Sequence, residues 1–137
     1  MIIDVVLPCL NEAEALPWLL ARMPSGFSPL IVDNGSSDGS AEIARAAGAL
    51  VVVAAQRGYG AACHAGLLAV TSDVVMVMDA DASLDPHELP AVAAPVVVCR
   101  ADLVLGRRTT RSLRAWAPSA PCWRRVSSST ISVIPNS

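Results

Sequence analysis

Residues 74–81 read VVMVMDAD, five apolar residues followed by two aspartates that are separated by one alanine. A short run that is apolar at every position is typical of a strand buried on both faces, as in parallel sheets. Asp79 and Asp81 follow that strand in a turn, where both carboxylates can point to one spot. Carboxylates suit Mg²⁺ or Mn²⁺, which binds one or two of them together with the phosphates of a substrate. The alternative is a structural turn in which each aspartate caps a nearby backbone amide.

Similar apolar runs occur elsewhere in the chain, and helical patterns separate them. Apolar strands that alternate with helices predict an α/β fold, with a mostly parallel, Rossmann-like sheet and helices on both faces. Residues 91–101 are ambiguous, because the valines at 96–98 favour a strand whereas Pro95 weakens that interpretation. The predicted strands are 2–7, 30–32, 50–54, 74–78 and 103–105, and the predicted helices are 13–23, 41–47, 61–70 and one that begins after Asp85.

Polar or glycine-rich sequence follows four of the predicted strands. In open α/β sheets, ligands bind outside the carboxyl ends of the strands. We therefore expect the functional site along this edge of the sheet. The segments concerned are 8–12, 33–38, 57–60 and 79–81.

Three of these segments carry side chains suited to a nucleotide. Asp33 can accept hydrogen bonds from a nucleobase or a ribose, although an Asx-type turn with Gly35 is the structural alternative. Glu12 can bind ribose or base, or it can lie in the first turn of a helix, where an acid is favourable. Arg57 can pair with a phosphate that approaches closely beside the backbone of Gly58.

A competing interpretation comes from residues 58–63, which read GYGAAC. They resemble the first five positions of the dinucleotide-binding fingerprint G-x-G-x-x-G, with Asp79 at a suitable distance downstream. Against it, the last position is Cys63, and the motif follows the third strand instead of opening the fold. It also leaves Asp33 and Asp81 without a role. An NAD(P)-dependent oxidoreductase is therefore kept as an alternative.

Composition and charge exclude several classes of protein. A chain of 137 residues with 53% hydrophobic and 16% charged residues is not disordered. It has no apolar run near the ~20 residues of a membrane span and no basic start of a signal peptide, so we expect a cytoplasmic protein.

The charge is unevenly distributed along the chain. Residues 1–102 carry a net charge of −8, whereas residues 103–137 carry a net charge of +6 and no acid. This contrast predicts a domain at 1–108 and an irregular basic tail rich in Ser, Arg and Pro at 109–137. We interpret the tail as a solvated or non-native end and expect no nucleic-acid partner.

Five stretches in order together resemble the donor-binding half of family 2 glycosyltransferases, which have the GT-A fold. The most similar members are the bacterial polyprenyl-phosphate sugar transferases related to dolichol-phosphate mannosyltransferase. The stretches are VLPCLNE at 6–12, IVDNGSSDGS at 31–40, RGYGAA at 57–62, VMDAD at 77–81 and ADLVLGRR at 101–108.

The resemblance implies a role for each matched residue. Pro8, Asn11 and Glu12 would line the nucleotide pocket, and Asp33 would hold the base. Arg57 and Gly58 would lie against the nucleotide. Asp79 would reach the ribose or the water shell of the metal, and Asp81 would hold Mg²⁺ or Mn²⁺ at the diphosphate. The implied reaction moves a sugar with inversion from a UDP- or GDP-sugar to an acceptor such as a polyprenyl phosphate, at the periphery of a membrane.

The sequence departs from the family after Arg108. The acceptor-side half is not recognisable, and the expected carboxylate base is missing, because residues 103–137 contain no Asp or Glu. We therefore expect a truncated or frame-shifted product, which could also be a non-catalytic nucleotide-binding module. A truncated sheet exposes an edge or an apolar face, which predicts self-association into a homo-oligomer.

Overall fold

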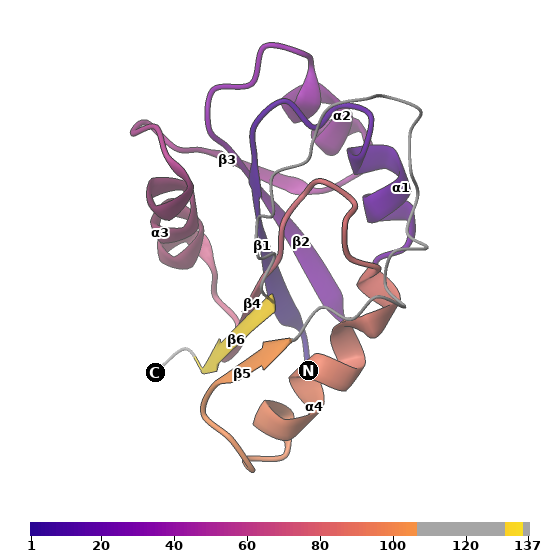
Figure 1. The fold of residues 1–137 in the computed structure, drawn as a ribbon, viewed down its shortest axis with the longest axis vertical. Coiled ribbons are helices and arrows are strands. Elements are labelled where there is room, and N and C mark those ends of the chain that lie inside the picture. The colour runs from indigo at the N-terminus through magenta and orange to yellow at the C-terminus, as the bar shows by residue number, and fades with distance from the viewer. Residues whose placement is uncertain (107–130, 136–137) are drawn as a thin grey trace.

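A computed structural model describes residues 1–106 and 131–135 of the chain. Its centre is a six-stranded sheet in the order β3-β2-β1-β4-β6-β5 (Figure 1). The first four strands of the chain run parallel, and β6 is antiparallel to both β4 and β5. The strands are β1 (Ile3–Cys9), β2 (Phe27–Asp33), β3 (Leu50–Val53), β4 (Val74–Val77), β5 (Val104–Gly106) and β6 (Ile131–Pro135).

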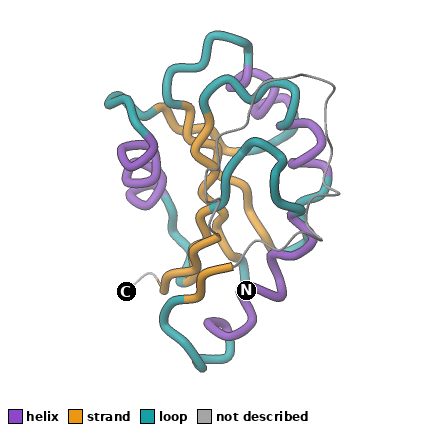
Figure 2. Tube along the Cα trace, in the orientation of Figure 1, coloured by secondary structure: helices purple, strands orange, loops and turns teal. Residues whose placement is uncertain are grey.

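Helices cover both faces of the sheet (Figures 1 and 2). On one face lie α1 (Leu16–Ala21), α2 (Ser40–Ala46) and α4 (Leu89–Val97), which follows the short 3-10 helix η1 (Pro86–Glu88). On the other face lies α3 (Tyr59–Ala69). The predicted α/β class, with a mostly parallel sheet between helices, is confirmed.

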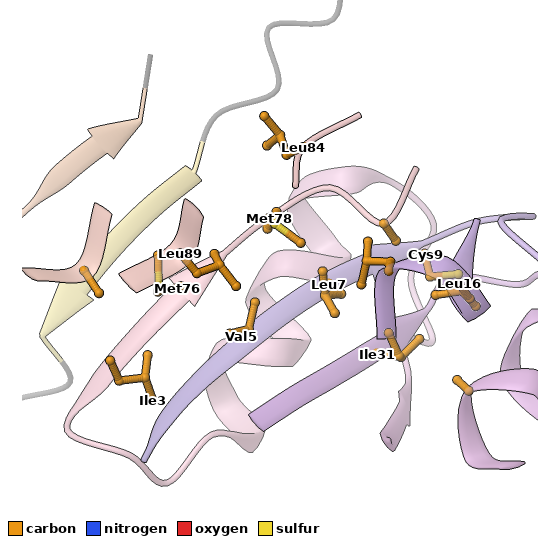
Figure 3. Packing of buried hydrophobic residues seen from close by; sticks show 14 of the residues in the cluster. Ile3, Val5, Leu7, Cys9, Leu16, Ile31, Met76, Met78, Leu84 and Leu89 are labelled. Carbon is orange, nitrogen blue, oxygen red and sulfur yellow. The ribbon is translucent and has the colours of Figure 1, made fainter. Parts of the chain in front are cut away.

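The central strands contribute side chains to two hydrophobic cores, one on each face of the sheet, because successive side chains of a strand point to opposite faces. Val5, Leu7 and Met76 pack on the side of α1 and α4 (Figure 3), whereas Val6 and Val77 pack on the side of α3. This explains why the sequence of these strands is apolar at every position instead of alternating.

Gly66 lets α3 approach the sheet closely. A Cβ atom added there would clash with Cγ1 of Val6 and lie 3.0 Å from Cγ2 of Val32. Both valines are fully buried in β1 and β2. The missing side chain therefore sets the distance between this helix and the sheet.

Three elements differ from the sequence prediction. The helix predicted at 13–23 is confined to Leu16–Ala21, and the ambiguous segment 91–101 forms most of α4, with Pro95 inside it. Helix forms there because Leu89, Ala93 and Val96 share one buried face at helical spacing. Within the tail predicted to be irregular, residues 131–135 form β6, which gives both β4 and β5 a backbone partner. Residues 109–130 of that tail lie outside the described residues.

Candidate functional site

The sheet has a topological switch point between β1 and β4. The chain leaves β1 toward β2 on one side and returns through α3 to β4 on the other side. The loops after β1 and β4 both begin here, at the carboxyl edge of the sheet, which is where ligands of such sheets bind. These loops contain Glu12, Asp79 and Asp81.

The loop after β1 is fixed by the loop after β2. Three successive backbone N–H groups of the first loop donate to side-chain oxygens of the second, and Asn11 has a left-handed backbone with φ +58°. Its amide oxygen accepts in return from the backbone N–H of Ser37 at 2.9 Å. The three bonds run from Asn11 to Ser36 Oγ at 3.0 Å, from Glu12 to Ser40 Oγ at 2.9 Å and from Ala13 to Asp38 Oδ2 at 3.0 Å.

Asp33, the predicted base ligand, ends β2 in a buried position. Its Oδ1 accepts from the backbone N–H of Ser36 at 3.2 Å, which is the turn bond that the structural alternative requires. Its Oδ2 has no hydrogen-bond partner among residues 1–106. The carboxylate thus stabilises the turn after β2.

Asn34 connects β2 to the loop that carries Arg57, and the sequence did not single it out. The buried carboxamide donates to the backbone oxygen of Gln56 at 2.8 Å and accepts from the backbone N–H of Gly58 at 2.8 Å. The guanidinium of Arg57 lies over Gly35, where an added Cβ would be 3.5 Å from Nη2. The structure therefore brings Arg57 and Gly58 beside the turn that holds Asp33. The signal that could have located Asn34 is its position directly after a buried strand.

Among residues 1–106, each of the two aspartates after β4 accepts one hydrogen bond. Asp79 Oδ1 accepts from the hydroxyl of Tyr59 at 3.0 Å, and Asp81 Oδ1 accepts from the backbone N–H of Ser83 at 2.9 Å. Partial burial and then the charge of Asp79 raise the pKa of Tyr59 above its ordinary value. Tyr59 is a second residue that the sequence did not single out.

Four acidic side chains gather at this edge, those of Glu12, Asp38, Asp79 and Asp81. Burial raises the pKa of Glu12 to about 7, and the charges of Asp81, Asp38 and Asp79 add to the effect. No ion pair within residues 1–106 involves any of these four acids. Asp38 itself stays ionised, because the hydrogen bond from the Ser40 hydroxyl lowers its pKa.

This surplus of negative charge fits a divalent cation. No group of three or more metal-ligating side chains occurs in the part of the chain that is described. Asp79 and Asp81 would therefore contribute only part of a coordination sphere, as is usual for Mg²⁺, which keeps waters and substrate phosphates as its other ligands.

Two further predicted positions lie beside this cluster. Pro8 lies within β1, one residue before its end, and pairs in register with Val32. The competing fingerprint at 58–63 lies at the start of α3 and follows β3, an edge strand of the described sheet, whereas the switch point lies between β1 and β4. Among the described helices, none has the length and apolar character needed to cross a membrane.

Comparison with known protein families identifies the family of this chain. The family model for glycosyl transferase family 2 matches residues 4–121, past the position near Arg108 where we expect family-like sequence to stop.

Named relatives share this family. An uncharacterized glycosyltransferase of Mycobacterium tuberculosis is 52% identical over 106 residues, which is 77% of this chain and 48% of the relative. An undecaprenyl-phosphate 4-deoxy-4-formamido-L-arabinose transferase of Pseudomonas savastanoi is 36% identical over 128 residues. The match covers 83% of this chain and 38% of the relative. The chain thus spans about half the length of these relatives or less.

Solved structures show the same fold. Glucosyl-3-phosphoglycerate synthase of Mycobacterium tuberculosis superimposes with a TM-score of 0.67 at 27% identity, over 74% of this chain and 43% of that one. The same enzyme in complex with Mn²⁺, UDP-glucose and phosphoglyceric acid gives a TM-score of 0.66 at 26% identity. The match covers 74% of this chain and 42% of that enzyme.

Proposed function

The chain belongs to glycosyltransferase family 2, and from this premise we propose that it is the donor-binding part of an enzyme that moves a sugar from a nucleoside diphosphate sugar to a lipid phosphate. The observation that carries the proposal is the cluster of Glu12, Asp79 and Asp81 at the switch point between β1 and β4. Carboxylates that form no ion pair within residues 1–106 suit a cation that binds a diphosphate.

The nucleoside would lie along the loops after β1, β2 and β3. Asp33 would offer a base its Oδ2, which has no hydrogen-bond partner among residues 1–106, and Glu12 would bind a ribose or base. Arg57 brings a positive charge over the turn of Asp33 and can pair with a phosphate, while Gly58 permits close approach of the backbone. Asn11 and Pro8 would line the nucleotide on the side of β1.

Asp81 would hold Mg²⁺ or Mn²⁺, with Asp79 as a second ligand or a partner of its water shell. When bound, the ion supplies Lewis-acid stabilisation of the departing nucleoside diphosphate. Structural neighbours crystallised with UDP and either Mn²⁺ or Mg²⁺ support this choice of ion.

The lipid-phosphate acceptor is supported by the names of the undecaprenyl-phosphate transferases among the relatives. Such an acceptor would place the protein at the cytoplasmic periphery of a membrane. The carboxylate base that the family uses is unassigned, since no acid follows Asp102 in this chain.

Thermal unfolding with UDP, GDP or NAD, each with and without Mn²⁺, tests the donor site. A ligand at about 100 times its Kd adds roughly 2.7 kcal/mol of stability, which raises the midpoint by several degrees. We expect one nucleoside diphosphate to stabilise the chain, and to do so much more strongly with Mn²⁺. A shift with NAD alone would favour the oxidoreductase.

Two variants of residues flanking β4 give a matched comparison. Asp81→Asn should abolish the Mn²⁺-dependent part of the shift. Asp73→Asn, an exposed acid at the opposite end of β4, should leave it intact. Turnover of a UDP-sugar with a polyprenyl phosphate then separates an active transferase from a non-catalytic binding module.

A further inference from the structure

Tyr59 and Asp79 come from different layers of the fold and meet at the carboxyl edge. Tyr59 is the first residue of α3, on one face of the sheet, and Asp79 lies two residues beyond the end of β4. The Tyr59 hydroxyl donates to Asp79 Oδ1 at 3.0 Å. Gly66 holds α3 close to β1 and β2, so the starting turn of this helix has a fixed place beside the sheet.

The bond is not explained by core packing. Tyr59 is 57% exposed, so its hydroxyl could be hydrated without a partner. Asp79 is half-buried and accepts only this one hydrogen bond within residues 1–106. The contact therefore orients the carboxylate more than it anchors the ring.

We propose that Tyr59 is a positioning residue for Asp79. By holding Oδ1, the hydroxyl fixes the rotation of the carboxylate and leaves Oδ2 free for a divalent cation or its water shell. Hydrogen bonds to a ligating carboxylate usually orient it for the metal, and their loss costs about 10–100-fold in affinity. The inference rests on the proposed function, because it requires the cation at Asp81 and Asp79.

The positioning role of Tyr59 is tested by titrating the chain with Mn²⁺ in the presence of UDP. The electron paramagnetic resonance signal of free Mn²⁺ measures how much of the ion is bound. Tyr59→Phe keeps the ring and removes the hydroxyl, and we expect the Mn²⁺ Kd to rise about tenfold. The unfolding midpoint without ligand should stay close to that of the unmodified chain. Thr71→Val removes a hydroxyl beyond the other end of α3 and should leave the Mn²⁺ Kd unchanged.

A double-mutant cycle with Asp79→Asn separates positioning from a general effect on folding. If Tyr59 acts through Asp79, Tyr59→Phe should weaken Mn²⁺ binding when Asp79 is present and change little in a chain that already carries Asp79→Asn. An equal loss in both backgrounds, or no loss in either, would overturn the inference.

The same titration distinguishes the two proposals. Absence of Mn²⁺ binding to the unmodified chain with UDP or GDP would remove the proposed function and this inference together. Binding that Tyr59→Phe leaves unchanged would remove the role of Tyr59 alone.

Discussion

Arg22 and Asp85 form a two-point ion pair, with Nε 3.1 Å from Oδ1 and Nη2 2.6 Å from Oδ2. The pair joins the end of α1 to the start of η1, and the guanidinium also lies 4.9 Å from the centre of the Trp18 ring. Asp85 in addition accepts from the backbone N–H of His87 at 3.1 Å, as expected of a residue that caps a helix start. The loop that carries Asp79 and Asp81 ends at this pair.

Arg22→Ala should therefore lower the free energy of unfolding at pH 7 only modestly, because both side chains are about one third exposed. The Arg22 hydrogen bond holds the pKa of Asp85 below its ordinary value, so the stabilisation is present above pH ~3.9 and is lost as the pH falls further. Urea unfolding from pH 7 to pH 2 should show the two curves converging in acid. A constant difference at every pH would contradict this account.

Glu12 should make stability fall as the pH rises. Its pKa is about 7 in the folded chain and ~4.3 in an unfolded one, so the folded state holds an extra proton between these values. Glu12→Gln should be more stable than the unmodified chain at pH 8, by about 1–2 kcal/mol after solvent screening, and about equal at pH 4. Urea unfolding at both pH values measures this, with the exposed neighbour changed in Glu14→Gln as the control. If the free energy of unfolding depended on pH equally in all three chains, Glu12 would not be the group whose ionisation lowers stability.

Gly66→Ala should destabilise the fold although alanine favours helices. The gain in helix propensity is at most ~1 kcal/mol, whereas overpacking against the buried Val6 and Val32 costs about 1–3 kcal/mol. We expect a net loss of about 1–2 kcal/mol in urea unfolding. Gly60→Ala in the same helix meets no atom within 4 Å and should be neutral or slightly stabilising. The opposite order of the two variants would mean that α3 can move away from the sheet at little cost.

Asn34→Ala should loosen the loop that carries Arg57 and Gly58. It removes the bonds to the Gln56 oxygen and the Gly58 N–H, which costs about 1 kcal/mol of stability because these backbone groups can be hydrated. If the loop holds the nucleotide as proposed, UDP affinity measured by calorimetry should fall about fivefold. Gln56→Ala keeps the backbone acceptor and should retain both stability and affinity. Unchanged UDP affinity in Asn34→Ala would place the nucleotide away from this loop.

The sheet could be predicted from the sequence because its central strands are buried on both faces and leave uninterrupted apolar runs. The start of α1 could not be predicted, since the backbone N–H groups of residues 11–13 are bonded to Ser36, Ser40 and Asp38, far along the chain. Residues 13–15 form a turn before the helix, and the backbone N–H groups of Ala15 and Leu16 donate to the Glu12 oxygen. Asn34 and Tyr59 were missed for a related reason, because their partners become visible only when the strands are placed side by side.

The strand order also has a consequence for the sequence of events during synthesis. β5 leaves the ribosome before β6, yet in the described chain β5 is joined to the sheet only through β6. The parallel part of the sheet can assemble earlier, leaving the backbone edge of β4 unpaired until β6 arrives. Pairing between strands that are far apart in the sequence is slow, and an unpaired edge accepts strands from other chains. The nascent protein therefore passes through an interval in which it is most open to mispairing, and a chaperone that shields strand edges would act there.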